Sequence, residues 1–345
     1  YVPTEISDQT LWDTYLPPFE AGVEAGAATL MSAFHTISGI PASANHYILT
    51  EVLKEKWKHD GFVVSDWGAV EQLVYQGMAE NKKEAAMLAF NAGIEMDMAD
   101  RMYIKYLPEL IEEGKVSIKQ VDEAVRRILR VKLRLGLFEN PYVDEKSEEE
   151  MYLLPKSLEL TERFASESMV LLKNEGNVLP LENVKTIGLI GPGAKDCAEH
   201  LGNWGARARV EDVVSVFQGM TREFGGKAKL LTAKGCAFEG EDKSGFSEAV
   251  KVAKASDVVV ICLGHKGGWS GENQSRSTIE IPDIQEDLLD VVEATGKPVV
   301  VLLTGGRPLD LRRVEPKSDA ILMLWHSGIR AGYAVAGLLS GKYNP

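Results

Sequence analysis

The sequence has no excess of basic residues. It holds 38 Lys and Arg against 51 Asp and Glu, which gives a formal net charge of −13. Nucleic-acid binding draws on clustered cationic side chains that neutralise phosphates, and anionic membrane surfaces attract runs of Lys and Arg. We therefore expect neither nucleic acid nor a membrane among the partners of this protein.

Long apolar runs and cysteines are also scarce. No stretch reaches the roughly 18 consecutive apolar residues that predict a membrane-spanning helix. The three cysteines, Cys197, Cys236 and Cys262, include no CxxC pair, so neither a disulfide framework nor a zinc site is expected. No His, Cys and carboxylate set has metal-ligand spacing, and we expect neither a metal nor a cofactor.

The length and the local composition predict two domains. A chain of 345 residues suggests two units at about 150 residues each. An Asn-Pro pair at 140–141 and an acidic run up to residue 150 predict a linker at 141–160, between a domain at 1–140 and a domain at 161–345. The sequence begins at Tyr1 without Met or a leader, and we expect it to be part of a longer protein.

The region 1–140 alternates short apolar runs with helical patterns. Strands are expected at 28–34, 61–66 and 94–98, with helices between and after them. This order predicts parallel strands covered by helices, as in a (β/α)8 barrel or a doubly wound sheet. A complete barrel takes about 250 residues, so about 140 residues supply only its C-terminal part.

The region 161–345 shows a second α/β pattern. Strands are expected at 186–190, 258–263, 299–303 and 320–324. Helices are expected at 160–172, 211–224, 245–255 and 283–295. The pattern predicts a compact parallel or mixed sheet with helices on both faces, that is, an α/β sandwich domain.

The first candidate site is the sequence SDWG at 65–68, which ends an apolar strand. A carboxylate at the carboxyl end of a parallel strand stands where α/β folds place their chemistry. The indole of Trp67 can stack on a pyranose, and Asp66 can attack or hydrogen-bond a sugar. The alternative is that Asp66 only caps the helix that follows.

The second candidate is the glycine-rich loop GGWSGENQSR at 267–276. It holds a single carboxylate, Glu272, between a strand and the Ile-Pro pair at 281–282, although a solvated surface loop would have the same composition. Retaining glycoside hydrolysis needs two carboxylates, a nucleophile and an acid/base, on either side of one bond. Asp66 and Glu272 are candidates for such a pair.

Beside these motifs, the chain resembles glycoside hydrolase family 3, most closely its bacterial β-glucosidases, along nearly its whole length. The stretches that carry the resemblance are YLPPF at 15–19, GFVVSDW at 61–67, AGIEMDM at 92–98, AVRRILRVKLRLGLF at 124–138, VLLKN at 170–174, IGP at 190–192, GGRPL at 305–309 and YNP at 343–345. Each stretch is weak alone, and together in this order they are highly specific.

The resemblance implies roles for individual residues. It makes Asp66 the nucleophile, and Glu272 the acid/base because an Arg and an Ile-Pro pair follow it. It places Met31 and Phe34 at the first sugar subsite, where the family often has Tyr in place of Phe34. It also implies substrate-binding positions for Trp67, Trp269 and Arg276.

The resemblance further implies the fold and the activity. The fold is the C-terminal part of a (β/α)8 TIM-like barrel followed by an α/β sandwich, without the family's C-terminal fibronectin-like domain. The activity is that of a retaining, exo-acting β-glucosidase, which releases terminal β-D-glucose from cellobiose or aryl glycosides. The missing barrel segment is expected from another chain or another part of the protein. The family resemblance allows a homodimer and favours a periplasmic or secreted location.

Several alternatives remain open from the sequence. Glu280, Asp283 and Glu286 compete with Glu272 for the acid role, although acidic residues at a helix start need no function. The IGPGA stretch at 190–194 resembles a dinucleotide turn but lacks its third glycine. A sugar-binding protein without catalysis and a β-xylosidase are the other candidates.

Overall fold

The computed structural model describes residues 3–345, except for the side chain of Glu149. The chain divides into two compact units, Tyr1–Glu145 and Lys146–Pro345. We call them unit 1 and unit 2 and describe each by itself. The expected linker 141–160 is irregular only as far as residue 146, because the helices α7 (Ser147–Met151) and α8 (Pro155–Ser168) follow. Pro155 lies in the first turn of α8, a position that proline favours in helices. The acidic run before it is typical of a linker, so the sequence pattern did not indicate that this helix begins there.

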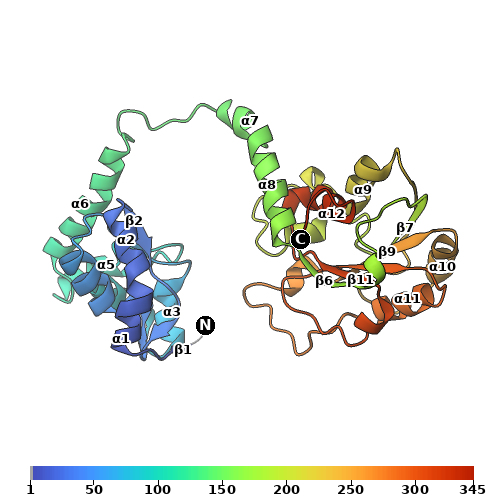
Figure 1. Ribbon diagram of the computed structural model, residues 1–345. Helices are drawn as coiled ribbons and strands as arrows, with labels where there is room; N and C mark the ends of the chain where they lie inside the picture. The colour runs from blue at the N-terminus through green and yellow to red at the C-terminus, as the bar shows by residue number, and fades with distance from the viewer. Residues whose placement is uncertain (1–2) are drawn as a thin grey trace. The chain divides into compact units, whose positions relative to one another are not determined.

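Unit 1, coloured from blue to green in Figure 1, has a parallel pair of strands at its centre, which the register of its backbone hydrogen bonds defines. Its strands are β1 (Pro3–Thr4), β2 (Thr29–Met31), β3 (Thr36–Ile37), β4 (Ile40–Pro41) and β5 (Phe62–Val64). Its helices are α1 (Asp8–Thr10), η1 (Leu11–Tyr15), α2 (Leu16–Glu24), η2 (Ala42–Ala44), η3 (Tyr47–Lys56), α3 (Ala69–Tyr75), α4 (Lys82–Ala92), α5 (Met102–Glu112) and α6 (Ile118–Arg134). The helices η1 and η3 are π-helical.

The short sheet of unit 1 is an arc of a barrel. β2 pairs with β5 in parallel, and a parallel bridge joins Val64 to Met96 in the segment expected as a third strand. Val63 faces a core made with α3, α4 and α5, so Val64 points to the other face of the sheet because side chains alternate along a strand. Within residues 3–145, these strands do not close into a complete barrel.

Unit 2 contains a six-stranded sheet in the order β6-β11-β10-β9-β7-β8. Its strands are β6 (Val170–Asn174), β7 (Thr186–Ile190), β8 (Lys229–Ala233), β9 (Val258–Gly264), β10 (Val299–Thr304) and β11 (Ala320–Met323). Besides α7 and α8, its helices are α9 (Val216–Phe224), α10 (Phe246–Lys254), α11 (Asp283–Glu293) and α12 (Ala331–Leu339), with the short helical turns η4 (Glu175–Asn177), η5 (Ala198–Leu201), η6 (Val210–Asp212), η7 (Gly267–Trp269), η8 (Glu315–Lys317) and η9 (Gly328–Arg330). All strand pairs are parallel except β6 with β11.

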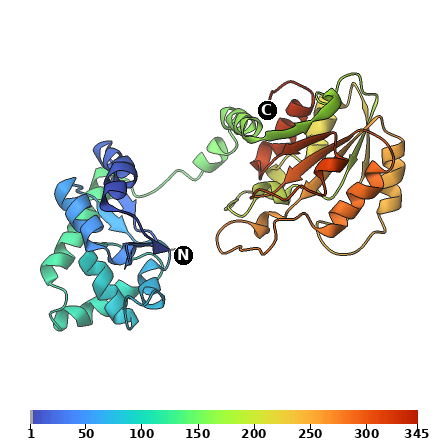
Figure 2. The same cartoon turned by 60° about the horizontal axis from the view of Figure 1, so that its bottom comes forward.

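Helices cover both faces of this sheet (Figure 2). Val258, Val260 and Cys262 of β9 pack with α9 and α12, and the alternate residues Val259 and Ile261 pack with α10 and α11. A strand buried on both faces is apolar at every position, which is why β9 reads as an unbroken apolar run. The result is the α/β sandwich predicted from the sequence.

Candidate active site

Asp66 stands just beyond the carboxyl end of β5. Register pairs Met31 of β2 with Val64 of β5, and Asp66 follows Val64 by two residues. Because side chains alternate in extended backbone, Met31, Val64 and Asp66 belong to the face of the sheet opposite to Val63. The carboxyl edge of the arc therefore brings the predicted nucleophile and one predicted subsite residue together.

The backbone around Asp66 is held by the next strand segment. The buried Ser65 hydroxyl accepts a hydrogen bond from the Met98 amide at 2.8 Å, and the Ser65 amide donates to the Met96 carbonyl at 2.8 Å. Gly68 has a φ of +73° and donates to the Met98 carbonyl at 3.1 Å. This left-handed turn, which glycine adopts without strain, leads from Asp66 into α3.

The Asp66 carboxylate is half-buried and accepts a hydrogen bond from the Trp67 amide at 2.7 Å. The Trp67 side chain is 72% exposed, and Met31 is exposed as well, although both are large and apolar. Phe34 lies three residues beyond β2, where its carbonyl accepts a hydrogen bond from the Gln76 side chain. Exposed apolar walls around a carboxylate can hold the apolar face of a sugar.

Two further carboxylates at this edge bind backbone instead. Asp97 accepts a hydrogen bond from the Tyr103 amide at 3.1 Å, at the start of α5. Asp100 accepts from the Glu71 amide at 2.9 Å, in the first turn of α3, and burial raises the pKa of its carboxyl group. Both side chains serve as helix caps.

In unit 2, β7 lies between β8 and β9 in the sheet. The chain passes from β7 to β8 on one side of β7 and then crosses to β9 on its other side. The carboxyl ends of β7 and β9 thus border the point where strand order reverses, which is where open α/β sheets bind ligands. The loop between β9 and α11, residues 265–282, starts there and carries Glu272 (Figure 2). Glu272 is exposed on this loop.

The loop gathers aromatic and cationic groups around Trp269. The Arg276 guanidinium lies 4.4 Å from the centre of the Trp269 ring, and the Lys266 ammonium lies 5.6 Å from it. The imidazole of His265 meets the same ring edge-on at 5.2 Å between centres. The two residues predicted to bind substrate, Trp269 and Arg276, are therefore in contact with each other.

The base of the loop is rigid. The buried Gln285 side chain of α11 accepts a hydrogen bond from the Gly264 amide at 2.7 Å and donates to the Gly264 carbonyl at 2.9 Å. His265 donates through Nε2 to the Glu280 carbonyl at 2.8 Å, and burial lowers the pKa of its imidazole. His265 is 1% exposed, so its side chain packs in the core.

A second histidine, His326, links the loop to the segment that contains Glu199. His326 donates through Nδ1 to the Glu199 carbonyl at 2.8 Å, which leaves Nε2 to accept from the Ser270 hydroxyl at 3.3 Å. The Glu199 carboxylate accepts a hydrogen bond from the Gly267 amide. Burial lowers the pKa of His326, so this imidazole stays neutral in the bonding pattern described.

Two family models account for nearly the whole chain. The glycosyl hydrolase family 3 N-terminal domain matches residues 1–131, and the family 3 C-terminal domain matches residues 169–345. The chain belongs to glycosyl hydrolase family 3. The resemblance seen in its motifs and the predicted barrel-plus-sandwich fold class are thereby confirmed.

Curated relatives and solved structures of family 3 cover this chain end to end. A periplasmic β-glucosidase of Salmonella typhimurium is 36% identical over 100% of this chain and 48% of its own length. A β-xylosidase of Formosa agariphila is 34% identical over 99% of this chain and 49% of its own. A Listeria innocua β-glucosidase crystallised with isofagomine superposes with a TM-score of 0.91 at 37% identity, over 99% of this chain and 48% of that one. The family 3 chain thus spans about half the length of these relatives.

Two of the other acidic candidates in unit 2, Asp283 and Glu286, have structural partners, while Glu280 is exposed. Glu286 is 2% exposed and pairs with Arg313, and burial raises the pKa of its carboxyl group. Asp283 pairs with Arg313 as well, in the first turn of α11. These two carboxylates therefore stabilise the start of a helix.

The glycines of the dinucleotide-like turn serve strand packing. Gly191 has a φ of +107°, and a Cβ atom there would lie 2.3 Å from the Cys262 carbonyl oxygen of β9. A Cβ atom at Gly193 would lie 3.2 Å from the Cβ of Cys262. Close approach of β7 and β9 explains these glycines without a nucleotide.

The sequence reasoning missed Trp204, whose side chain is 71% exposed. It lies on the segment 202–205, which packs against the Glu272 loop: a Cβ atom at Gly271 would meet the Asn203 side chain at 2.4 Å, and one at Gly267 would meet the Gly202 backbone at 2.9 Å. A tryptophan between two glycines, in GNWG at 202–205, was the available signal.

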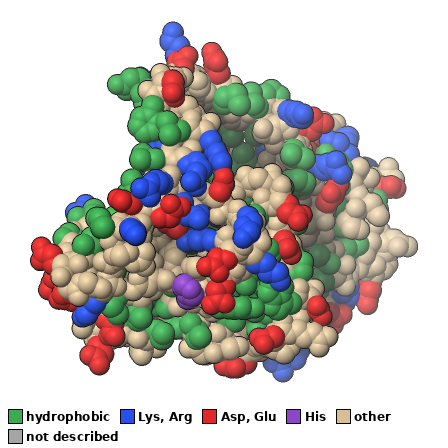
Figure 3. Space-filling model, turned by 90° about the vertical axis from the view of Figure 1, so that its left-hand side faces the viewer, with side chains coloured by type: hydrophobic (Ala, Val, Ile, Leu, Met, Phe, Trp, Pro, Cys, Tyr) green, Lys and Arg blue, Asp and Glu red, His purple; other side chains and the backbone are tan. Residues whose placement is uncertain are grey.

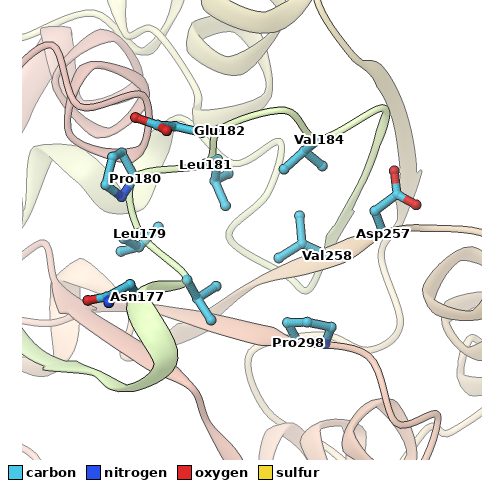
Figure 4. A pocket seen from close by; sticks show the side chains of 10 residues that line it. Asn177, Leu179, Pro180, Leu181, Glu182, Val184, Asp257, Val258 and Pro298 are labelled. Atoms are coloured by element: carbon cyan, nitrogen blue, oxygen red, sulfur yellow. The ribbon is translucent and has the colours of Figure 1, made fainter.

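Unit 2 also has a cleft of about 480 Å³ at the opposite edge of its sheet (Figure 4). Val258, Pro298 and Asp257 line it at the amino ends of β9 and β10, together with residues 177–182 and Val184. Parallel sheets bind ligands at their carboxyl ends, so this cleft is not the candidate site. Within residues 3–345, no His, Cys, Asp and Glu cluster could hold a metal ion, and no helix is long and apolar enough to cross a membrane.

Proposed function

We propose that this family 3 protein is a retaining, exo-acting β-glucosidase that releases terminal β-D-glucose from cellobiose-like oligosaccharides and aryl β-glucosides. One observation carries the proposal: Asp66 lies at the carboxyl end of a barrel strand, beside the exposed indole of Trp67 and on the same sheet face as Met31. The periplasmic β-glucosidase of Salmonella and the Listeria β-glucosidase, both matched over the whole chain, support the substrate class.

In this mechanism, the Asp66 carboxylate attacks the anomeric carbon while the glycosidic C–O bond breaks. Protonated Glu272 gives its proton to the leaving oxygen, so the aglycone departs as an alcohol or phenol. The Glu272 carboxylate then takes a proton from water, which attacks the anomeric carbon and releases Asp66. Two inversions retain the β configuration.

The subsites follow from the same residues. Trp67, Met31 and Phe34 would form the wall of the first sugar subsite, since apolar surface at a carboxylate suits the apolar face of a pyranose. Trp269 and Arg276 ride on the loop of the proposed acid and would contact the leaving group. Trp204, exposed on the neighbouring segment, is a further candidate for this side.

A β-xylosidase activity is the second candidate, because the Formosa agariphila β-xylosidase is 34% identical over 99% of this chain. The two substrates differ by the 6-hydroxymethyl group of glucose. A screen of p-nitrophenyl β-glycosides on the complete protein separates the candidates. A kcat/KM for the β-xyloside above that for the β-glucoside would overturn the glucosidase proposal.

We also propose that a further segment, from another chain or another part of the protein, completes the barrel. Within residues 3–145, β2 pairs only with β5, and an apolar cavity of about 300 Å³ lined by Leu30 and Met31 of β2 and by Phe19 lies beside it. On α6, the stripe Val125, Leu129 and Leu133 is exposed, and hydrophobic side chains also lie among the charges of the face in Figure 3. Such apolar surface is typical of an interface.

The catalytic pair is tested with two substitutions in the complete protein. Asp66→Ala is expected to abolish turnover even of 2,4-dinitrophenyl β-glucoside, because no acid can replace a missing nucleophile. Glu272→Gln is expected to keep the first step on this activated substrate and to lose about 10²- to 10⁴-fold on phenyl β-glucoside, as expected for loss of a general acid.

Azide serves as the discriminating reagent. It is a nucleophile that needs no base, so it should accelerate Glu272→Gln on the activated substrate and yield β-glucosyl azide. Asp97→Asn, which alters a helix cap, is the matched carboxylate control for Asp66. Retained turnover by Asp66→Ala would reject the nucleophile assignment.

A further inference from the structure

The loop that carries Glu272 packs against the segment that follows β10, the strand next to β9. β9 and β10 are adjacent and parallel, so the loop after β9 and the segment 305–311 after β10 leave the same edge of the sheet. Asp310 donates its amide to the Ile279 carbonyl at 3.0 Å, and a parallel bridge joins Glu280 to Asp310. These contacts join the C-terminal end of the loop, at residues 279–280, to the segment 305–311.

Arg307 binds the backbone on both sides of Glu272. One terminal nitrogen of its guanidinium, Nη2, donates to the Trp269 carbonyl at 2.6 Å and to the Gln274 carbonyl at 2.8 Å. These carbonyls lie three residues before and two residues after Glu272. A single cationic nitrogen therefore joins the two ends of the six-residue turn 269–274. Hydrogen bonds from a charged donor such as this one are stronger than those between neutral groups.

The guanidinium of Arg307 is committed to this turn. Among the side chains that the structure describes, no carboxylate forms an ion pair with it, and its buried Nε has no acceptor. The nearby Arg312 and Arg313, by contrast, pair with the carboxylates of Asp310 and of Asp283 and Glu286. A half-buried cation that is bonded to two carbonyls of one loop is placed to shape that loop.

The residue before Arg307 fits the same loop sterically. A Cβ atom at Gly306 would lie 2.1 Å from the Ser270 Oγ and 2.7 Å from the Ser270 Cβ. Ser270 is buried, and its hydroxyl bonds to His326. The backbone of the segment 305–311 thus contacts the loop at Ser270, before Glu272. The small glycine at this contact lets Arg307 bind the loop backbone both before and after Glu272.

We infer that Arg307 is a positioning residue for the acid/base step: it fixes the backbone on both sides of Glu272 so that the carboxyl group is held at the leaving oxygen. The inference rests on the proposed role of Glu272. Arg307 itself touches the loop and not the reacting atoms. Its loss would therefore widen the range of positions of Glu272 and leave attack by Asp66 intact.

This role has a signature in leaving-group dependence. Departure of 2,4-dinitrophenolate needs no proton, whereas departure of phenolate at neutral pH gains strongly from general acid catalysis. In the complete enzyme, Arg307→Ala is expected to lower kcat/KM about 10- to 100-fold for phenyl β-glucoside and less than about 3-fold for the dinitrophenyl substrate, as partial loss of that catalysis predicts. Arg307→Lys, which keeps a cationic donor, should recover part of the loss.

Controls and a structural readout accompany these rates. Arg312→Ala removes an exposed guanidinium just beyond the segment 305–311 and should change neither substrate's kcat/KM. Hydrogen exchange should become faster at 267–276 in Arg307→Ala and stay unchanged in β9, which detects the release of the loop independently of activity. Arg307→Lys serves for both readouts if the alanine variant fails to fold.

The results for Arg307 and for Glu272 can be distinguished. An equal loss on both substrates, or no loss on either, overturns the positioning role of Arg307 when Glu272→Gln retains its own leaving-group dependence. If Glu272→Gln shows no leaving-group dependence, the proposed acid is wrong and the inference about Arg307 falls with it.

Discussion

At the scale of single residues, the candidate site depends on buried polar groups that the sequence could not reveal. The SDWG motif made Asp66 conspicuous, but nothing in it indicated that the Ser65 hydroxyl binds the Met98 amide. Arg307 stood in the GGRPL stretch only as a mark of resemblance. Its two bonds to the Glu272 loop depend on β9 and β10 being neighbours, which only the fold decides.

Ser65→Ala is expected to lower the free energy of unfolding by about 1–3 kcal/mol, because it leaves the part-buried Met98 amide without its acceptor. It should also lower kcat, since Ser65 precedes the proposed nucleophile. Urea unfolding followed by circular dichroism measures the first effect. Ser157→Ala, at an exposed position of α8, should stay within about 0.5 kcal/mol of the wild type.

His200 gives the stability of unit 2 a dependence on pH. Burial lowers the pKa of its imidazole to about 4, with His326 as a smaller cause. The unfolded chain binds a proton near pH 6.5 while the folded one does not, so this stability is complete above pH 6.5 and is lost as pH falls toward 4. The loss amounts to about 3 kcal/mol at most.

The test is urea unfolding at pH 7, 5.5 and 4.5. His200→Gln should flatten the pH dependence of the unit 2 transition, whereas His35→Gln, at an exposed position of unit 1, should leave it unchanged. An equal pH dependence in wild type and His200→Gln would show that this imidazole does not carry the effect.

At the scale of elements, strong periodic patterns were predicted well and edges were not. The buried strands β7, β9, β10 and β11 are the apolar runs expected at 186–190, 258–263, 299–303 and 320–324. β8 and β6 lie at the two edges of the sheet and were missed, and residues 170–172 were expected to continue a helix. Antiparallel pairing of β6 with β11 decides the conformation of residues 170–172. A local sequence pattern carries no information about that partner strand.

Two other differences have similar causes. α12 was missed because it is buried all round, so its sequence AGYAVAGLL shows no polar face and no helical period. The expected third strand at 94–98 is reduced to a bridge at Met96. The helices α4, α5 and α6 lie between or after the expected strands, as predicted, because each combines helical spacing with a clear start or stop.

Gly264 tests how tightly the ends of β9 and β10 must pack. It has a φ of +133°, and an added Cβ would lie 2.0 Å from the Thr304 carbonyl oxygen. Gly264→Ala should therefore cost backbone strain of about 1–3 kcal/mol plus a clash of similar size. Gly240 is the matched control, since its φ is +109° and no atom lies within 4 Å of an added Cβ.

Gly240→Ala should cost the strain alone, so the difference in unfolding free energy between the two variants isolates the clash. Activity should fall in Gly264→Ala and persist in Gly240→Ala, because the Glu272 loop begins at Gly264. Equal destabilisation by the two substitutions would contradict close packing at this strand end.

At the scale of the whole molecule, the two units differ in how completely each buries its apolar surface. Unit 2 covers both faces of a six-stranded sheet, whereas unit 1 leaves apolar side chains of α6 and a strand edge exposed. The length arithmetic, about 140 residues where a barrel needs about 250, anticipated an incomplete barrel in unit 1. Composition could not say which surfaces would be left uncovered.

Limited proteolysis tests the boundary between the units. Residues 141–146 are exposed and form neither helix nor strand, so endoproteinase Glu-C should cut first after Glu139 or Glu145. Two fragments, ending and beginning near residue 145, should then resist further digestion. A variant with Gln at both positions should slow the first cut, and a first cut inside either unit would contradict the boundary.

The fixed base of the Glu272 loop has a consequence for how such enzymes diversify. Gln285 and the Glu280–Asp310 bridge hold both ends of the loop to the sheet, while residues 271–280 between them are exposed. Changes in the length or sequence of the tip therefore do not propagate into the strands. Under the proposed function, leaving-group preference can drift, or be exchanged by grafting residues 268–278 from a relative, while the scaffold and the proposed nucleophile stay as they are.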